Sequence, residues 1–235
     1  MNKNPKLYVV ATPIGNPGDI TLRAIEILKN IDFLICEEYK IGSKLLNHLK
    51  IKKPLELLNE HNEGEETDVI LEKLLLTNET AAIISDAGTP LFADPGNELV
   101  RKCHLNGIPV IPIPGVSSIM TALMVSGLSL EKFLFYGFLP ANKFERIKAI
   151  KKLPSQYDLI LLEAPYRLKQ LMRDLLKTLS DKREAIIAYK LTYPEEKLFW
   201  GTLKELQIMT QNLPKGEFVF ILKKISDERN NYKKR

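Results

Sequence analysis

Short, almost entirely apolar segments alternate with helical patterns through the first half of the chain, and this alternation constrains the fold most. The apolar segments cover residues 7–12, 33–36, 55–58, 81–84 and 110–113. Segments with one apolar face, such as 21–30 and 66–76, separate them. Strands that are apolar on both faces are typical of a parallel sheet with helices on both sides. We therefore predict an α/β fold whose first half holds a parallel sheet.

The second half has a different order of elements. The Pro-rich segment 108–115, IPVIPIPG, ends the first series, so we place a domain boundary between residues 114 and 115. Three later segments, 184–191, 197–202 and 217–224, read as strands with a single helix among them. This order indicates mixed or antiparallel pairing. The sequence thus predicts two α/β domains, 1–114 and 115–235, with a frayed tail at 226–235.

Composition excludes several classes of protein. Hydrophobic residues make up 45% of the chain and charged residues 27%, which excludes intrinsic disorder, collagen and a coiled coil. No apolar run reaches roughly 18 residues, so we expect no membrane span, and the N-terminal segment lacks a signal-peptide pattern. Cys36 and Cys103 lie in apolar or helical contexts, which favours the cytoplasm over a disulfide framework. No His, Cys and Asp cluster has ligand spacing, so we predict no metal site.

Charge is distributed unevenly. Residues 1–115 hold 12 basic and 16 acidic side chains, a net charge of −4, whereas the remaining residues hold 22 and 13, a net charge of +9. A basic half beside an acidic half fits an enzyme that binds a polyanion. Lysine-rich helices that only face solvent would give the same asymmetry, and both interpretations stay open.

Loops at the carboxyl ends of parallel strands are where ligands of such sheets bind. The first of these loops offers only Gly15 and Gly18, and Asp19 would repel a pyrophosphate, so a dinucleotide fingerprint is incomplete. Glu37 and Glu38 stand where such a fold places its ribose ligand, which is a half-match to NAD.

Carboxylates in these loops favour a cationic ligand over a phosphate-rich one. Asp86 and Asp94 follow the segment 81–84 and add to the two glutamates at 37 and 38. An acidic pocket attracts a positive ligand such as a sulfonium methyl donor. Aspartates beside Gly and Pro also cap turns, so each of the two has a purely structural alternative.

Five segments together carry a family resemblance. LYVVATPIGNPGDITLRAIEIL, SDAGTPLFADPG, PIPGVSS, FLFYGFLP and EAPYRL resemble, in order and spacing, the ribosomal RNA small subunit methyltransferase I family of the tetrapyrrole methylase superfamily. The resemblance implies a tetrapyrrole methylase-like fold with S-adenosyl-L-methionine in the cleft between two domains, and a cytoplasmic homodimer. It implies methyl transfer to the ribose 2′-hydroxyl of a cytidine in 16S ribosomal RNA within the small ribosomal subunit.

The resemblance also assigns residues. Glu38 and Lys40 are the implied catalytic residues. The implied cofactor-binding positions are Ile14, Thr89, Pro90, Phe92, Ser118, Ile119, Glu163, Ala164 and Ala188.

Departures from the family pattern bear on the substrate. The family's Asp-Thr-Arg after the glutamate is here Glu38-Tyr39-Lys40, and lysine lacks arginine's bidentate grip on phosphate. Tyr166 stands where the family has histidine, before Arg167. The chain also stops near its last strand, which suggests a compact subfamily, whereas the triplet His-Asn-Glu is kept at 61–63.

Transfer to a hydroxyl needs a general base, and transfer to RNA needs a basic surface. Candidate bases are Glu38, Glu37, Lys40, Asp86 and His61. Candidate phosphate contacts are Arg167 and the basic residues of one helix, Lys143, Arg146, Lys148, Lys151 and Lys152. Tyr39 and Tyr166 could stack on a base or simply line a cleft.

Two alternatives to an RNA methyltransferase remain. One is a small-molecule acceptor such as a tetrapyrrole, although 87–90 reads AGTP and not the GGDP type of those enzymes. The other is a non-catalytic RNA-binding member of the fold.

Overall fold

The computed structural model describes residues 4–92, 94–129 and 131–225. Contacts divide the chain into two compact units, Met1–Ser118 and Ile119–Arg235, which we call unit 1 and unit 2. The boundary expected between residues 114 and 115 lies just before this division. Within the described ranges, no helix combines the length and the apolar character that crossing a membrane requires.

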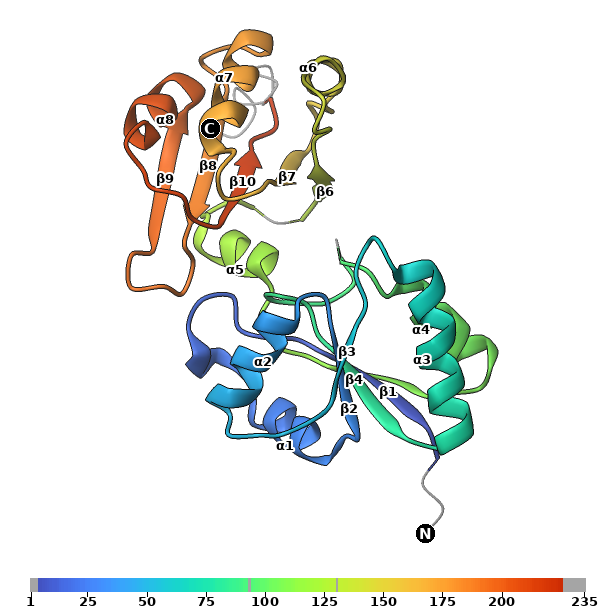
Figure 1. Cartoon of the computed structure of the whole chain (residues 1–235). Helices are drawn as coiled ribbons and strands as arrows, with labels where there is room; N and C mark the ends of the chain where they lie inside the picture. The colour runs from blue at the N-terminus through green and yellow to red at the C-terminus, as the bar shows by residue number, and fades with distance from the viewer. Residues whose placement is uncertain (1–3, 93, 130, 226–235) are drawn as a thin grey trace. The chain divides into compact units, whose positions relative to one another are not determined.

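Unit 1 contains a five-stranded sheet in the order β3-β2-β4-β1-β5 (Figure 1). Its strands are β1 (Lys6–Val10), β2 (Phe33–Cys36), β3 (Leu55–Leu57), β4 (Thr80–Ile83) and β5 (Val110–Ile113). Every neighbouring pair is parallel. The prediction of a parallel sheet is confirmed.

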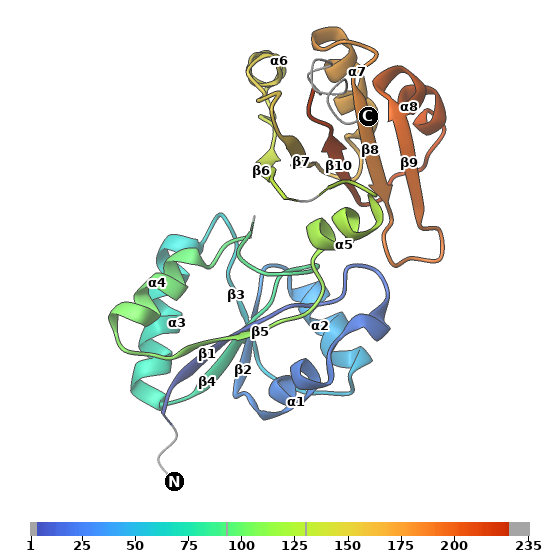
Figure 2. The same cartoon turned by 180° about the vertical axis from the view of Figure 1, so that it is seen from behind.

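Helices cover both faces of this sheet. They are α1 (Leu22–Asn30), α2 (Tyr39–His48), α3 (Glu63–Thr77) and α4 (Asn97–Leu105), with a 3-10 turn at Pro17–Asp19. The sheet side chains alternate: Phe33 and Ile35 pack with α3 and α4, whereas Leu34 packs with α1 and α2. Figure 2 shows the two helix pairs on opposite sides of the strands. Helices cover both faces, which is why apolar residues dominate the strands, above all the buried β2 and β4.

The start of α2 differs from the sequence prediction. We expected a helix at 43–49 capped by Ser43, but α2 begins at Tyr39, and Glu38 is the N-cap residue. Gly42 therefore lies inside the helix, where a Cβ would approach within 2.7 Å of the Cys36 Sγ. Glycine is read from sequence as a helix breaker, but here it lets α2 pack closely against β2.

Unit 2 contains a mixed sheet in the order β6-β7-β10-β8-β9. Its elements are α5 (Ser118–Val125), β6 (Phe133–Phe138), α6 (Lys143–Lys151), β7 (Asp158–Leu162), α7 (Leu168–Thr178), β8 (Glu184–Tyr189), β9 (Lys197–Thr202), α8 (Leu203–Thr210) and β10 (Phe218–Leu222). β6 and β7 are parallel, and the other three pairs are antiparallel. The predicted mixed sheet is confirmed.

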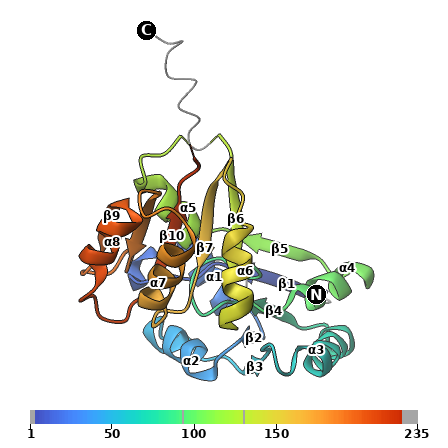
Figure 3. The same ribbon diagram turned by 90° about the horizontal axis from the view of Figure 1, so that it is seen from above.

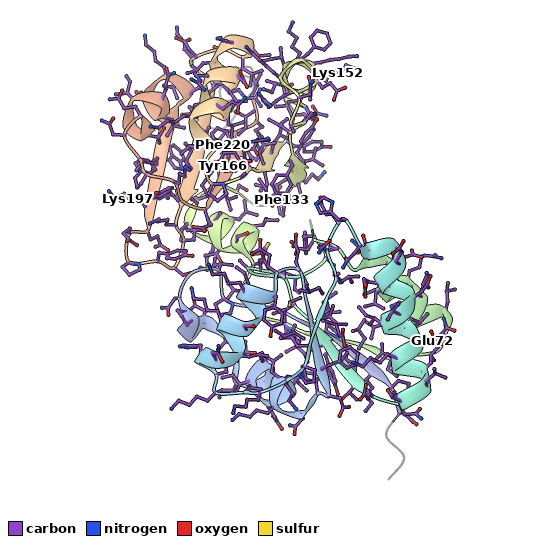
Figure 4. All side chains as sticks on the ribbon, in the orientation of Figure 1. Glu72, Phe133, Lys152, Tyr166, Lys197 and Phe220 are labelled. Atoms are coloured by element: carbon purple, nitrogen blue, oxygen red, sulfur yellow. The ribbon has the colours of Figure 1, made fainter. Side chains whose placement is uncertain are left out.

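One face of the second sheet packs against α6, α7 and α8 (Figure 3). Ile150 from α6, Leu171 from α7 and Leu206 from α8 contribute to this core. Phe220 from β10 is fully buried within it (Figure 4). The helices therefore rest on the sheet through apolar contacts, and their polar faces point away from it.

Arg146 lies inside unit 2, contrary to its predicted contact with RNA. The residue is only 1% exposed. Its Nε donates to the Asp174 Oδ2 at 2.9 Å, and its Nη1 donates to the carbonyl oxygens of Pro140 (3.0 Å) and Ala141 (2.7 Å). A buried arginine needs such partners to offset its lost hydration. Arg146 thus fastens α6 to α7, and it is unavailable to a phosphate.

Candidate functional site

The carboxyl edge of the unit 1 sheet gathers four loops. Because all five strands are parallel, the segments that follow β1, β2, β4 and β5 leave the sheet at the same edge. These are the loops in which we predicted the ligand-binding site from the sequence. Their contacts show which of the predicted residues lie together.

Hydrogen bonds join the loops after β1 and β4. The amide N–H of Thr12 donates to the Gly88 carbonyl at 2.8 Å, and the Gly88 N–H donates back to the Thr12 carbonyl at 3.1 Å. The Thr12 hydroxyl also donates to the Ser85 carbonyl at 3.3 Å. The two loops are therefore held in one fixed arrangement beyond the strand ends.

Gly88 brings three predicted cofactor-binding residues together. A Cβ on Gly88 would lie 3.1 Å from the Ile14 Cγ2 and 3.9 Å from the Ser118 amide nitrogen. The neighbouring Thr89 hydroxyl donates to the Val116 carbonyl at 3.0 Å. Gly88 also has a φ of +86°, which L side chains rarely adopt. Glycine is required here for both reasons, and it draws the loops after β1, β4 and β5 close together.

Pro90 and Phe92 follow in the same loop and differ in exposure. Pro90 is buried, whereas Phe92 is 59% exposed. Leu91 between them has a φ of 71°. A leucine with positive φ is strained, and such strain persists only where the surrounding structure enforces it.

Three acidic side chains at this edge have raised pKa values. Burial raises the pKa of the Glu37 carboxyl to about 7, and nearby carboxylates, Asp86 first among them, add to the rise. Burial followed by the charge of Glu38 raises the pKa of Asp86, although a hydrogen bond from the Glu38 backbone opposes this. Burial and the charge of Asp86 raise the pKa of Asp94. Glu37 follows β2, whereas Asp86 and Asp94 lie in the loop between β4 and α4, and the three carboxyl groups interact through their charges.

Glu37→Gln should stabilise the protein at high pH. The pKa of Glu37 lies above its ordinary value of 4.5, so the native state binds this proton more tightly than the unfolded chain does. The ionised carboxylate therefore destabilises the fold above about pH 7, and the penalty fades as the pH falls toward 4.5. Glu37→Gln should raise the melting temperature at pH 8 and change it little at pH 4.5. The exposed Glu65→Gln is the control, and an equal shift of Glu37→Gln at both pH values would contradict this.

The two predicted catalytic residues lie beside this acidic group. Glu38 and Lys40 are both exposed, at the N-cap and in the first turn of α2. The Glu38 side chain makes no capping hydrogen bond. One oxygen of Asp86, Oδ1, is buried and has no hydrogen-bond partner among the described residues. The Glu38 carboxylate therefore does not cap α2, and the Asp86 Oδ1 does not stabilise the loop through a hydrogen bond to a described residue.

The triplet at 61–63 has a structural role that the sequence did not reveal. The Glu63 Oε1 accepts a hydrogen bond from the Gly96 N–H at 2.6 Å, which ties the start of α3 to the loop before α4. The Asn62 amide donates to the Leu57 carbonyl at 3.1 Å. His61 is exposed, and its backbone N–H donates to the Asn59 Oδ1 at 3.0 Å. These contacts hold loops in place, and the role of His61 as a base stays a prediction.

Glu163 and Ala164 lie together at the carboxyl end of β7 in unit 2. The Glu163 Oε1 accepts a hydrogen bond from the Ala164 N–H at 2.9 Å and lies 3.4 Å from the Arg167 Nη1. Ala188 is fully buried in β8, where it pairs with Val219. Ile119, near the start of α5, is 7% exposed. The roles predicted for these four candidates are not tested by their positions.

A comparison with protein families identifies the chain's relatives. The family described as Tetrapyrrole (Corrin/Porphyrin) Methylases matches residues 6–207. The chain belongs to the tetrapyrrole methylase family. This methylase is 40% identical over 218 residues to "Ribosomal RNA small subunit methyltransferase I" of Synechocystis sp., covering 92% of the chain and 78% of that protein. The protein of the same name from Halalkalibacterium halodurans is 42% identical, with 92% and 75% covered. The resemblance predicted from sequence motifs is confirmed.

Solved structures show the same fold for this methylase. Uroporphyrin-III-C-methyltransferase from Thermus thermophilus matches with a TM-score of 0.64 at 21% identity, covering 93% of this chain and 94% of that one. A diphthine synthase matches with a TM-score of 0.72 at 14% identity, covering 94% and 90%. At such identities these likenesses establish the fold.

Methyltransferases of this family use S-adenosyl-L-methionine, and the chain is a methyltransferase that depends on it. The residues present fit this cofactor. Its sulfonium is a cation, and unit 1 brings Glu37, Asp86 and Asp94 to one edge, with an unpartnered oxygen on Asp86. Within the described ranges, no three His, Cys, Asp or Glu side chains are placed to hold a metal ion.

Proposed function

We propose that the chain methylates the ribose 2′-hydroxyl of a cytidine in 16S ribosomal RNA within the small ribosomal subunit. The observation that carries this proposal is the similarity to ribosomal RNA small subunit methyltransferase I proteins, which spans 92% of the chain at 40% identity. Their name gives RNA of the small subunit as the substrate. The basic second half supports a polyanionic substrate, since it holds a net charge of +9.

Methyl transfer to a ribose hydroxyl makes two demands on the protein, alignment of the acceptor and removal of its proton. S-adenosyl-L-methionine supplies, when bound, a methyl group that is already activated. The protein's share is to align the acceptor hydroxyl and to remove its proton, because a ribose hydroxyl is a weak acid. Glu38 is the proposed general base that accepts this proton, because its side chain is exposed and makes no capping hydrogen bond. Glu37, with a pKa raised to about 7, is the alternative base, since such a pKa suits proton transfer near neutral pH.

Lys40 is proposed to hold the substrate. Its side chain is exposed in the first turn of α2, two residues after Glu38. An ammonium group there would pair with a phosphate of the RNA and place the neighbouring ribose near the base.

Thr89→Tyr should prevent cofactor binding without unfolding the chain. The proposed cofactor-binding residues of unit 1 are Ile14, Thr89, Pro90, Phe92 and Ser118, and those of unit 2 are Ile119, Glu163, Ala164 and Ala188. Thr89 is half-buried between the loops after β4 and β5, so a tyrosine ring would fill that space. We expect affinity for S-adenosyl-L-methionine to fall at least about tenfold, with the matching loss of thermal stabilisation.

Thermal shift with S-adenosyl-L-methionine and with NAD tests this expectation. The wild type and the control Thr77→Tyr, at an exposed position of α3, should respond to the first ligand and not to the second. Normal cofactor binding by Thr89→Tyr would show that the site lies elsewhere. A response to NAD alone would rule out the assignment of the cofactor.

We also propose that the protein acts in the cytoplasm, since small ribosomal subunits are cytoplasmic. That it acts there as a homodimer is proposed from the family resemblance. Sedimentation of the purified chain should give the mass of two copies.

Transfer of a labelled methyl group tests the proposed function. Small ribosomal subunits from cells that lack the gene should accept the label from S-adenosyl-L-methionine in the presence of the purified chain. Labelling of a tetrapyrrole and not of the subunits would establish the small-molecule alternative. Cofactor and RNA binding without labelling of any acceptor would indicate a non-catalytic member.

A further inference from the structure

Seven basic side chains project from α6, its C-cap residue and α7 without local partners. They are all exposed: Lys143, Lys148, Lys151, Lys152, Lys169, Arg173 and Lys177. Glu145 is the one exposed acidic residue of these helices. Across the described part of the chain, none of the seven belongs to an ion pair. The surface is therefore strongly positive and uncompensated.

The stripe on α7 is unfavourable for the helix itself. Lys169, Arg173 and Lys177 are spaced four residues apart, so neighbouring like charges lie on one face and repel. Lys169 is in the first turn, where a positive charge opposes the helix dipole, and only Lys177, in the last turn, is placed favourably. Helix stability does not explain the repulsion along the stripe, whereas binding of a polyanion does.

An exposed aromatic residue accompanies the charges on α6. Phe144 is 79% exposed, and helical spacing places it on the same face as Lys148 and Lys151. Arg146 and Ile150 occupy the opposite, buried face. An aromatic ring between lysines is the usual makeup of a surface that stacks on unpaired bases and neutralises their phosphates.

Topology places this surface next to the candidate residues of unit 2. β6 and β7 are adjacent and parallel, so the chain leaves both strands at the same edge to enter α6 and α7. Phe144 lies at the start of α6. Tyr166, which is labelled in Figure 4, is 63% exposed and follows Glu163 and Ala164 in the sequence. Two exposed aromatic residues therefore stand at that edge, and the basic stripe of α7 runs away from it.

The two helices form one rigid surface because a buried ion pair joins them. The Arg146 Nε lies 2.9 Å from the Asp174 Oδ2, and both side chains are almost fully buried. Figures 1 and 3 show α6 and α7 side by side on the sheet of unit 2. The two basic faces are therefore held at a fixed spacing. A rigid surface of this kind suits an extended RNA strand better than basic residues on a mobile tail would.

We propose that α6 and α7 form a platform for a single-stranded segment of the substrate RNA. Phe144 stacks on an unpaired base, and Lys169, Arg173 and Lys177 neutralise consecutive phosphates. The inference rests on the proposed function, because it takes RNA as the substrate. It adds that the bound segment of RNA is single-stranded, and it names the residues that hold this segment.

Binding of a fluorescein-labelled, unstructured 16-nucleotide RNA to the full chain tests the platform, by anisotropy at several salt concentrations. The triple change Lys169→Glu, Arg173→Glu and Lys177→Glu should weaken binding about tenfold or more and reduce the salt slope by about 2. Phe144→Ala should weaken binding about 5- to 100-fold and leave the slope unchanged, because stacking releases no counterions. Ile208→Ala and Lys204→Glu, at exposed positions of α8, are the controls for the loss of an apolar side chain and for charge reversal.

Equal affinities of the platform variants and the controls would overturn the proposal, and so would the absence of RNA binding by the wild type. A platform that binds an acidic protein instead would give these same negative results with RNA. Melting temperatures and S-adenosyl-L-methionine binding should match the wild type in every variant, and loss of either would show that a variant is misfolded. In that case, Lys169→Gln, Arg173→Gln and Lys177→Gln replace the reversals. Methyl transfer by the wild type is measured separately, so a failed proposed function is recognised independently of the platform.

Discussion

Glu38→Gln is expected to lower the rate of methyl transfer by about 10²–10⁴-fold, the usual share of a general base. Glutamine keeps the size and the hydrogen bonding of Glu38 but cannot take the proton of the ribose hydroxyl. The side chain is exposed and makes no capping hydrogen bond, so the fold should lose little stability. Affinity for S-adenosyl-L-methionine should change little, because the change removes an interaction with the acceptor. Single-turnover rates and melting temperatures on the same samples measure both effects.

The rates of Glu37→Gln and Glu65→Gln should be measured beside that of Glu38→Gln, the first as the alternative base and the second as the control. Glu65 is exposed on α3 and serves as the control for loss of a carboxylate. If Glu37→Gln loses the activity and Glu38→Gln keeps it, the base is Glu37, and the assignment to Glu38 is wrong. The pH profile also separates them, since a base with a pKa of about 7 should give a rate that still rises near neutral pH.

Arg146→Met should destabilise the chain by about 3–5 kcal/mol, because it leaves the buried Asp174 carboxylate without its partner. The arginine is 1% exposed and also donates to two backbone carbonyls at the start of α6. For a protein of this size the loss corresponds to a fall in melting temperature on the order of 10 °C. Thermal unfolding monitored by circular dichroism measures the shift.

Two further variants separate the buried charge from other effects. Arg101→Met breaks an exposed pair with Glu98 that water screens, so it should leave the melting temperature almost unchanged. Adding Asp174→Leu to Arg146→Met should recover much of the loss, because no unpaired charge then remains. An Arg146→Met variant as stable as Arg101→Met would show that the pair does not fasten α6 to α7.

The inner strands of unit 1 were predictable because they are apolar and buried on both faces. Leu34 and Ile35 point to opposite helix layers and are both fully buried, so an apolar run was the expected pattern. The start of α2 was not predictable, because Gly42 reads as a helix breaker until its packing against Cys36 is known. Local patterns thus specify which elements form more reliably than they specify where an element begins.

Arg146 shows a limit of reading charge from sequence. Among the lysines of α6 it looked like one more solvated cation, yet it is buried. A signal was present on α7, where Asp174 interrupts an apolar face between Met172 and Leu175. A buried carboxylate requires a cationic or hydrogen-bonding partner, and Arg146 is that partner.

The raised pKa of Glu37 could not be read from the sequence. It depends on burial and on Asp86 and Asp94, which reach the same edge only because β2 and β4 are neighbours in the sheet. The sequence did place these loops together through the rule for parallel strands. It could not give the distances that make the three carboxyl groups interact.

Mass mapping of 16S ribosomal RNA from cells with and without the gene tests the proposed methyl transfer. We predict that one cytidine carries a ribose methyl group in the presence of the gene and lacks it in the deletion strain. The methyl group should return with the wild-type gene and not with Thr89→Tyr. An unchanged methylation pattern of 16S ribosomal RNA in the deletion strain would contradict the proposed function.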